Sequence, residues 1–250
     1  MVSALRALLE RFTGSGKVAL ISYPKSGRTW VRFMLNAAGV EVTYDHAGAE
    51  NRDARRFDQI AGIPKRWSQW RIAFLFRDPR DTAVSSFFQA SKRVKQGRRF
   101  TGDIHQFIRD PRYGIEKIAR FNLLWMQSAP LFEDFMSVSY EALHANTEAE
   151  LSRLVAFATR ETPDPAVIAR AVEEGRFDRM RAAELNLGAR KDGQARLGGG
   201  DPADPESLKA RRGKVGGWTD YFSADDSAYA DSVLAHLDYD ERMASLHRAS

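Results

Sequence analysis

The segment that most constrains the fold is an apolar run that passes directly into a short polar loop. Residues 18–21 read VALI, which is apolar enough for a strand covered on both faces. The loop SYPKSGRTW occupies residues 22–30, and apolar side chains then recur at helical spacing as far as Ala37. Gly39 suits the C-terminus of that helix. The segment therefore predicts a strand, a tight loop and a helix, the building unit of α/β folds.

The loop carries more positive charge and hydrogen-bonding capacity than a simple turn needs. Lys25 and Arg28 stand on either side of Gly27, while Ser26 and Thr29 add two hydroxyl groups. The N–H groups at a helix N-terminus, together with these cations, attract an anion, most simply a phosphate. The alternative is an ordinary strand-to-helix turn with solvated charges. The residue types favour a P-loop-like phosphate site.

The loop does not match a Walker A sequence, because its lysine precedes the glycine instead of following it. A second candidate, GSGKV at residues 14–18, has valine in place of the Ser or Thr that would hold Mg²⁺. It also precedes the strand rather than following it. A P-loop-like nucleotide kinase therefore remains an alternative hypothesis only.

Strands and helices alternate along the rest of the chain. Further strands are predicted at Val40–Tyr44, at RIAFLF (71–76) and at FMSVSY (135–140). Helices are predicted after an N-cap at Asp81, over 114–128, over 146–158, from the Asp164-Pro165 pair through Val172, and after a capping box of Ser223 and Asp226. The alternation predicts one α/β domain over residues 1–250, with a central, mostly parallel sheet flanked by helices. Ligands of such sheets bind at the carboxyl ends of the strands, where YPKSG and RDPRD fall.

The amino-acid composition limits the classes of ligand and cofactor that we expect. The net charge of +5 and a pI of about 9.5 favour an anionic ligand. The absence of cysteine excludes disulfides and thiolate chemistry, and the five histidines show no metal-ligand spacing, so we expect no metal. The basic residues form separate motifs rather than one stripe, which disfavours a non-catalytic nucleic-acid-binding module. The basic run at 92–99 could dock an anionic acceptor, although a solvated face explains it better.

The first twelve residues, MVSALRALLERF, place apolar side chains on one helical face. Arg6, Glu10 and Arg11 interrupt that stretch, which makes it too charged for a signal peptide. We expect this face to pack on the domain rather than on a membrane. No apolar stretch approaches the ~20 residues of a membrane span. A cytoplasmic location follows by default.

Five motifs follow one another along most of the chain, namely YPKSGRTW at 23–30, RDPRDTAVSSF at 77–87, SVSYEAL at 137–143, RFDRM at 176–180 and RRGKVGGWTDYF at 211–222. Together they resemble the motifs of one enzyme family, the cytosolic-type sulfotransferases, in particular bacterial-like members. The donor of that family is 3′-phosphoadenosine-5′-phosphosulfate (PAPS), which leaves as 3′-phosphoadenosine-5′-phosphate (PAP). The resemblance implies transfer of a sulfuryl group from PAPS to an acceptor hydroxyl or amine, without a metal. The acceptor would be a small molecule, a glycan or a lipid, and the protein a monomer or homodimer.

The resemblance also implies a role for each matching residue. Lys25 would meet the charge that develops on the leaving phosphate as the S–O bond breaks. Trp30 and Phe177 would sandwich the adenine, with Tyr140 at its edge and Met180 in the same adenine-contacting motif. The donor's phosphates would be held by two groups: Ser26, Gly27, Arg28 and Thr29 at the 5′-phosphate, and Arg77, Ser85, Arg211, Arg212 and Gly213 at the 3′-phosphate.

The chain departs from the family pattern at two places. Arg28 stands where threonine is usual, which adds a charge for the donor or for an anionic acceptor. The family's Lys-Thr-His segment, which carries the base, is absent. His46 in YDHAG is the best candidate base, since its pKa lies near neutrality and bacterial members have a similar turn. The alternative is that Asp45 merely holds His46 as a polar loop residue. His105 and His144 have no motif support.

One segment lacks any core periodicity. Residues 192–206, DGQARLGGGDPADPE, contain four glycines and two prolines, which predicts a mobile surface loop within about 190–210. It lies between Phe177 and Arg211, which the resemblance assigns to the donor. We therefore expect it to close over the bound nucleotide as a lid.

Overall fold

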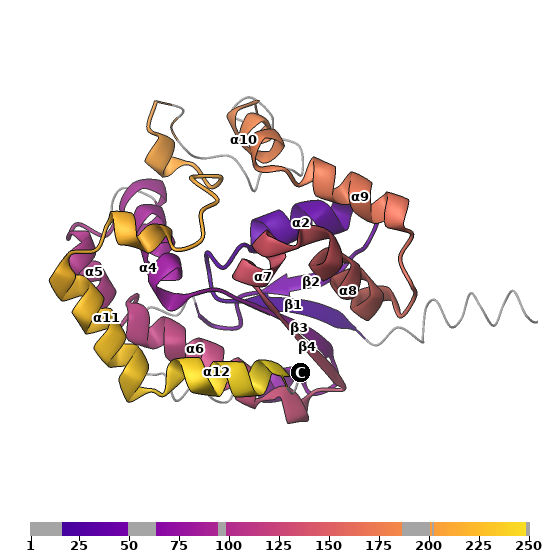
Figure 1. Ribbon diagram of the computed structural model, residues 1–250, viewed down its shortest axis with the longest axis horizontal. Helices are drawn as coiled ribbons and strands as arrows, with labels where there is room; N and C mark the ends of the chain where they lie inside the picture. Colours follow the sequence, from indigo (N-terminus) through magenta and orange to yellow (C-terminus); the bar gives the residue numbers. More distant parts are fainter. Residues whose placement is uncertain (1–16, 50–63, 95–98, 187–200, 202, 249–250) are drawn as a thin grey trace, which may run out of the picture.

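The computed structural model describes residues 17–49, 64–94, 99–186, 201 and 203–248 (Figure 1). The predicted N-terminal amphipathic helix lies outside the described residues, and so does most of the predicted lid loop. Among the residues that are described, no helix is long and apolar enough to cross a membrane.

Four parallel strands form the central sheet in the order β2-β1-β3-β4. The strands are β1 (Val18–Ser22), β2 (Thr43–Asp45), β3 (Arg71–Phe76) and β4 (Asp134–Ser139). The predicted fold class is confirmed. The predicted strand over 40–44 is wrong in its extent, because the N–H of Val40 bonds to the carbonyl of Leu35 and closes the preceding helix. Only residues 43–45 pair with β1.

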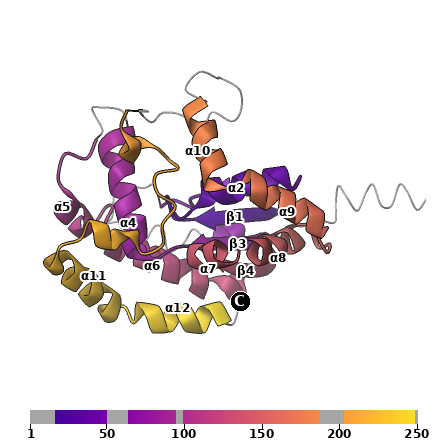
Figure 2. The ribbon, with the colours of Figure 1, turned by 45° about the horizontal axis from the view of Figure 1, so that its top comes forward.

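Helices cover both faces of the sheet. On one face, strand residues such as Ile21 and Phe74 pack against α6 (Ile115–Gln127), α11 (Ala224–His236) and α12 (Tyr239–Arg248). On the other, Leu20 and Leu75 pack against α2 (Arg28–Ala37), α7 (Tyr140–Ala145), α8 (Thr147–Thr159) and α9 (Pro165–Glu174). Figures 1 and 2 show α12 on one side of the strands and α2 on the other.

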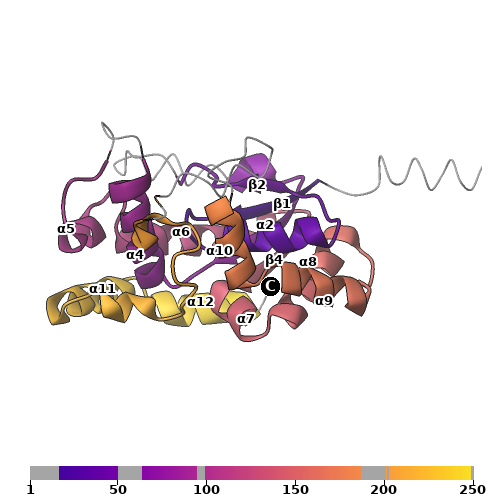
Figure 3. The same ribbon diagram turned by 90° about the horizontal axis from the view of Figure 1, so that it is seen from above.

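The remaining helices are α4 (Pro79–Phe88), α5 (Ile104–Arg109) and α10 (Phe177–Asn186). Short helical turns follow α4 and α10, namely η3 (Gln89–Arg93), η7 (Pro205–Ser207) and η8 (Gly217–Asp220), whereas η2 (Pro64–Trp67) and η5 (Ala129–Leu131) precede β3 and β4. Figures 2 and 3 place α10 between α4 and the α2/α9 side of the molecule. Segments distant in sequence therefore meet around one end of β1 and β3.

Local capping follows the sequence at most helix ends, with one correction. Ser223 and Asp226 form the predicted capping box of α11, and Asp164 caps α9 by accepting from the N–H of Ala166. Asp81 does not cap α4: Asp78 does, accepting from the N–H of Arg80 at 2.7 Å. Proline at the first helical position favours a start one residue after Asp78. Asp81 then lies inside the first turn, free to bind another segment.

The order in which strands are added to the sheet changes direction between β1 and β3. From β1 the chain passes through α2 to β2 on one side, whereas β3 pairs with β1 on the other side. The loops that leave the carboxyl ends of β1 and β3 therefore diverge at a topological switch point, where α/β proteins bind ligands. The two predicted anion motifs, which follow β1 and β3, meet here as expected.

Candidate active site

A cavity of about 580 Å³ lies at the carboxyl ends of the strands. It is lined by every predicted site residue except Ser26, namely Lys25, Gly27, Arg28, Thr29, Trp30, His46, Arg77, Ser85, Tyr140, Phe177, Met180, Arg211, Arg212 and Gly213. Ser26 lies in the same loop but is buried. The fold thus brings the five motifs, spread over two hundred residues, around one site.

The loop between β1 and α2 is shaped by backbone conformations that most residues avoid. Gly27 has a φ of 99°, and a Cβ at this position would lie 2.6 Å from Cδ2 of Tyr140. Only glycine fits such a position without displacing the ring. Lys25 also has a positive φ, of 75°. The loop turns so that the first N–H groups of α2, at Arg28 and Thr29, adjoin the cavity.

Lys25 lies in a strongly cationic setting. Burial, followed by the nearby charges of Arg93, Lys209 and Arg211, lowers its pKa to about 7 against the opposing effect of Glu184. Such a lysine is only partly charged at neutral pH. An anion placed beside it would restore the charge, so the site favours a negatively charged ligand.

Arg77 lines the cavity from the carboxyl end of β3, the strand that pairs with β1. Its guanidinium lies 4.2 Å from the centroid of the Tyr140 ring, 3.2 Å from the Asp81 carboxylate, and donates to the carbonyl of Lys214 at 2.9 Å. Asp81 in turn accepts from the N–H groups of Gly216 and Trp218, both at 2.9 Å. Asp81 therefore ties the segment after Gly213 to α4 and holds Arg77 in place.

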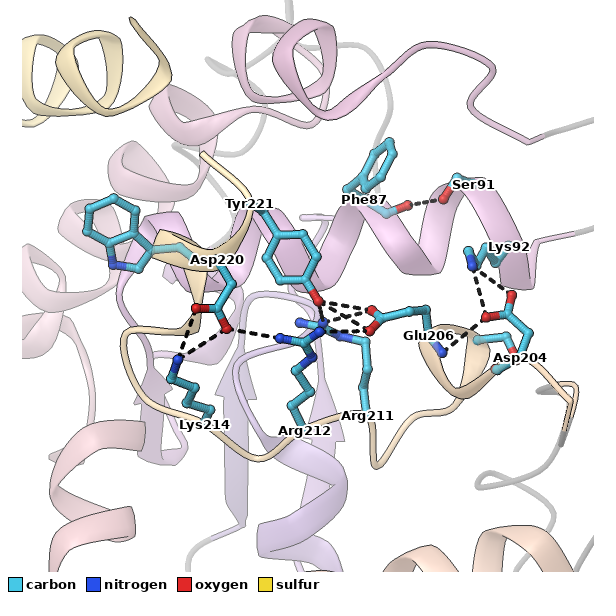
Figure 4. A network of polar contacts seen from close by, with 12 residues as sticks. Phe87, Ser91, Lys92, Asp204, Glu206, Arg211, Arg212, Lys214, Asp220 and Tyr221 are labelled. Carbon is cyan, nitrogen blue, oxygen red and sulfur yellow. Dashed lines mark hydrogen bonds and ion pairs between the residues drawn. The ribbon is translucent and has the colours of Figure 1, made fainter. Parts of the chain in front are cut away.

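Arg211 and Arg212 are held in a network of acidic residues (Figure 4). Arg211 donates to Glu206 at 2.9 Å and to the hydroxyl of Tyr221. Arg212 lies 3.3 Å from Glu206 and donates to Asp220 at 2.9 Å. Figure 4 shows Glu206 lying beside Arg211 and Tyr221, and Asp220 between Lys214 and Arg212. The two arginines are thereby oriented before any ligand binds.

Three aromatic rings border the cavity on the side of α2, α7 and α10. Trp30 and Tyr140 meet edge to face, with ring centroids 5.7 Å apart. Phe177 is 40% exposed, which is unusual for a phenylalanine and leaves a ring face available to a ligand. Met180 is buried beside Trp30. The arrangement offers aromatic faces to a planar group, as a nucleobase requires.

His46 follows β2 and contacts Ser22 and Arg28. Its Nδ1 donates to the carbonyl of Ser22 at 2.8 Å, and its Nε2 contacts Nη2 of Arg28. Burial, followed by the charge of Arg28, lowers the pKa of His46 to about 4, against the opposing effects of Ser22 and Asp45. His46 is therefore neutral at physiological pH and able to accept a proton. Oδ1 of Asp45 accepts from the N–H of Ala47, and the charge of Asp45 acts on the neighbouring imidazole.

Some residues in and beside the cavity were not predicted from the sequence. His144, which had no motif support, lines the cavity and donates to the carbonyl of Gly213 at 2.9 Å. Glu184 is buried and accepts from the N–H groups of Lys209 and Ala210 at 2.7 and 2.8 Å, which fixes the segment before Arg211. The apolar pattern carries no signal for these contacts, because they depend on the packing of α10.

The basic run at 92–99 is not simply a solvated face. Lys92 pairs with Asp204 at 2.7 Å, and Arg93 pairs with the buried Glu184 at 3.2 Å. These two residues anchor the 204–210 segment, while 95–98 lie outside the described residues. His105 bonds to Asp226 at 2.8 Å, and Arg109 also pairs with that carboxylate, away from the cavity. Within the described ranges, no three His, Asp or Glu side chains are grouped closely enough to hold a metal ion.

Comparison with protein families decides the identity. Residues 59–246 match the model of the family described as the sulfotransferase domain. The chain belongs to the sulfotransferase domain family. It is therefore a sulfotransferase, as its motifs implied. A search of curated proteins gives no match.

Solved structures share the fold at low identity. A mouse sulfotransferase, SULT7A1, complexed with PAP is 19% identical with a TM-score of 0.63, over 89% of this chain and 84% of that one. Retinol dehydratase in complex with androsterone and the inactive cofactor PAP is 17% identical with a TM-score of 0.60, over 89% and 80%. The same enzyme with retinol and PAP is 17% identical with a TM-score of 0.59, over 89% and 81%. At these identities the likeness shows the sulfotransferase fold and not the ligands.

Proposed function

We propose that this sulfotransferase transfers the sulfuryl group of PAPS to an acceptor hydroxyl or amine, with His46 as the base and Lys25 stabilising the leaving phosphate. The observation that carries the proposal is the single cavity in which the phosphate loop, the 3′-phosphate arginines, the aromatic rings and His46 meet. The similar folds that contain PAP also support PAPS as the donor.

The residues present fit this donor. The hydroxyl of Ser26 and Nε of Arg77 are buried without a hydrogen-bond partner among the described residues. Buried polar atoms of this kind normally have a partner, and a bound phosphate would supply one at each end of the donor. Arg77, Arg211 and Arg212 offer planar guanidinium groups, which suit a phosphate monoester. The adenine would lie between Trp30 and Phe177.

The proposed chemistry gives the chain two roles, to accept a proton from the acceptor and to stabilise the negative charge on the leaving group. PAPS supplies an activated sulfuryl group. His46 takes the proton of the acceptor on Nε2 while the acceptor oxygen or nitrogen bonds to sulfur and the bridging S–O bond breaks. Lys25 and the N–H groups at the start of α2 stabilise the negative charge left on the 5′-phosphate. Sulfuryl transfer, like phosphoryl transfer, depends mainly on this positioning and charge stabilisation.

A direct test is transfer of ³⁵S-labelled sulfuryl from PAPS to a panel of phenols, sugars, amines and lipids, with and without EDTA. We expect labelled product with at least one acceptor class, and no loss of rate with EDTA. Calorimetric binding of PAP is measured in parallel. Failure of PAP to bind, or turnover of ATP in place of PAPS, would contradict the proposal and favour the kinase alternative.

PAP binding should depend on pH because of Lys25. Below pH 7 the lysine is already protonated in the free protein, so affinity does not change on its account. Above the free-protein pKa of about 7, binding the polyanion must first protonate Lys25, so affinity falls as pH rises. Calorimetry at pH 8 in buffers of different ionisation enthalpy should show proton uptake on binding. The uptake should vanish in Lys25→Ala; unchanged uptake in that variant would contradict the assignment.

Arg77 should contribute to binding of the 3′-phosphate. We expect Arg77→Ala to weaken PAP binding by about 10- to 100-fold, since a charge-assisted contact to phosphate is lost. Binding of adenosine 5′-phosphosulfate, which lacks the 3′-phosphate, should weaken much less in the same variant. Arg80→Ala is the matched control, because Arg80 comes from the same motif but pairs with Asp78 and Asp231. Equal losses for the two nucleotides would show that Arg77 does not bind the 3′-phosphate.

The acceptor class, the cytoplasmic location, the oligomeric state and the absence of nucleic-acid partners stay predictions. The mouse and retinol dehydratase structures contain small-molecule ligands, among them androsterone and retinol. A small-molecule acceptor is accordingly the first class to screen.

A further inference from the structure

The proposed base is covered by a cation in this structure. Nδ1 of His46 lies 2.8 Å from the carbonyl of Ser22. A carbonyl only accepts, so Nδ1 carries the proton of the neutral ring and Nε2 keeps the lone pair. Arg28 has only donors, so its Nη2, which contacts Nε2, donates to that lone pair. The atom that must accept the proton of the acceptor is thus already engaged.

Arg28 stands at the end of α2 that is unfavourable for a cation. Arg28 is the first residue of the helix, whose first turn contains no acidic residue, and Lys25 lies three residues before it. The helix dipole disfavours a cation at this end. Arg32, one turn later, lies with its guanidinium 4.0 Å from the centroid of the Tyr44 ring. The two arginines therefore add positive charge where α2 faces β2.

Within the part of the chain that the structure describes, the charged groups that face His46 come from two elements. Arg28 and Arg32 approach it from α2, and Asp45 precedes it at the end of β2. Asp45 also accepts a hydrogen bond from the N–H of Ala47 within its own turn. The carboxylate thus serves the turn, whereas Arg28 reaches the imidazole directly.

The order of the sheet separates this pair from the residues assigned to the nucleotide. His46 follows β2, at one edge of the sheet, whereas Arg77 follows β3 and Tyr140 follows β4 on the opposite side of β1. Arg28 directs its side chain toward the β2 side, at His46. Both sides line the same cavity. The pair therefore lies where an acceptor would approach the base.

Resting on the proposed function, we propose that the acceptor carries an anionic group next to its accepting hydroxyl or amine, and that Arg28 binds this anion and so releases Nε2 of His46. A carboxylate, sulfate or phosphate presents two oxygens to the guanidinium fork. A neutral acceptor offers the guanidinium no charge to bind, so it competes less well than an anion with Nε2 of His46 for Arg28. Arg28 is then a specificity-determining residue that couples recognition of the acceptor to exposure of the base.

The first experiment follows the imidazole of His46 by NMR titration in the protein saturated with PAP. Replacing Arg28 by glutamine should raise the pKa of His46 by about 1 pH unit or more, because an adjacent cation is removed. Arg32→Gln, which removes an equal charge farther along the helix, is the matched control and should have a smaller effect. No rise in Arg28→Gln, or an equal rise in both variants, would overturn the proposal.

The second experiment adds matched acceptor probes to the same samples. The carboxylate 3-hydroxybenzoate and the sulfonate 3-hydroxybenzenesulfonate should each raise the pKa of His46, whereas the neutral 3-hydroxybenzamide should not. A response to one anion alone identifies the chemistry of the acceptor anion. In Arg28→Gln the anions should have no effect. Equal responses to anion and amide, no response to either anion, or an anion effect that persists in Arg28→Gln would each overturn the proposal.

Failure of this inference is distinguishable from failure of the proposed function. PAP affinity is measured for Arg28→Gln in parallel, because the backbone N–H of Arg28 is assigned to the 5′-phosphate and the variant retains it. A tenfold or greater loss would assign Arg28 to the donor and overturn the inference. Absence of PAP binding in the unmodified protein contradicts the proposed function. PAP binding with a His46 pKa that does not respond to Arg28 contradicts the inference alone.

Discussion

Replacing Lys25 by alanine is expected to lower kcat for sulfuryl transfer by about 10²–10³-fold, the usual effect of losing one donor to a developing negative charge. Lys25 lies in the phosphate loop and lines the cavity. Burial and three neighbouring cations already lower its pKa to about 7. Its positive charge is therefore of most use once the leaving phosphate becomes more negative. Single-turnover kinetics with saturating PAPS would measure the chemical step directly.

The same variant should fold normally, and this separates charge from packing. In the folded state the pKa of Lys25 lies below the ordinary value of 10.5, so the protonated form is disfavoured by folding. This penalty is fully present below about pH 7 and fades as the pH rises toward 10.5. At pH 6, Lys25→Ala should keep or slightly raise the melting temperature. A clear fall in melting temperature would indicate a packing role.

Lys214→Ala is the matched control for Lys25→Ala. Lys214 also lines the cavity, but it is exposed and pairs with Asp220 at 3.1 Å. Exposed pairs contribute little, so this variant should change kcat by less than about tenfold. If both lysine variants lose activity equally, the effect reflects the general positive potential of the cavity rather than a leaving-group contact.

Local sequence patterns predict the elements that we propose hold the donor, because each of these elements depends on short-range physics. The apolar run before the phosphate loop must be buried, and it forms β1. Gly27 must tolerate a positive φ next to Tyr140, and only glycine does so. The order of the motifs along the chain then predicts which strand ends lie close together. Each of these constraints acts over a few residues, so it can be recognised in the sequence.

Local sequence patterns do not predict contacts that depend on the angle between distant elements. Glu184 on α10 binds the backbone at Lys209 and Ala210, and nothing in the neighbouring sequence marks it. Asp81 resembles an N-cap in sequence, but Asp78 takes that role, and Asp81 binds the chain near Gly216 instead. In both cases a carboxylate serves backbone N–H groups from another part of the chain, which only the assembled fold brings within reach.

The contact of Arg28 with His46 is likewise one that local sequence patterns do not predict. The sequence marks Arg28 as a departure from the family pattern and His46 as a candidate base, but gives no reason to join them. Parallel pairing of β1 with β2 places Asp45 opposite Ile21 and so brings His46 beside the loop that leaves β1. The register of a three-residue strand thus determines which group Arg28 can reach.

His46→Asn is expected to lower kcat by about 10²–10⁴-fold with PAP affinity nearly unchanged, the range for loss of a general base. Asparagine can still donate to the carbonyl of Ser22, so the turn after β2 should persist. It cannot accept the proton of the acceptor at neutral pH. His144→Asn is the control, since His144 also lines the cavity but donates to the carbonyl of Gly213.

The pH profile of the same variants identifies the base. The neutral imidazole is the active form, so kcat/KM of the unmodified enzyme should be constant at neutral pH and fall as the pH drops through the His46 pKa of about 4. This acidic limb should disappear in His46→Asn and remain in His144→Asn. If it remains in His46→Asn, another group acts as the base, and Asp45, which lies next to His46 in the chain, is the first to test. A pKa this low also explains why the enzyme would gain from an acceptor that draws Arg28 away: with the cation displaced, His46 becomes a stronger base at the moment of transfer.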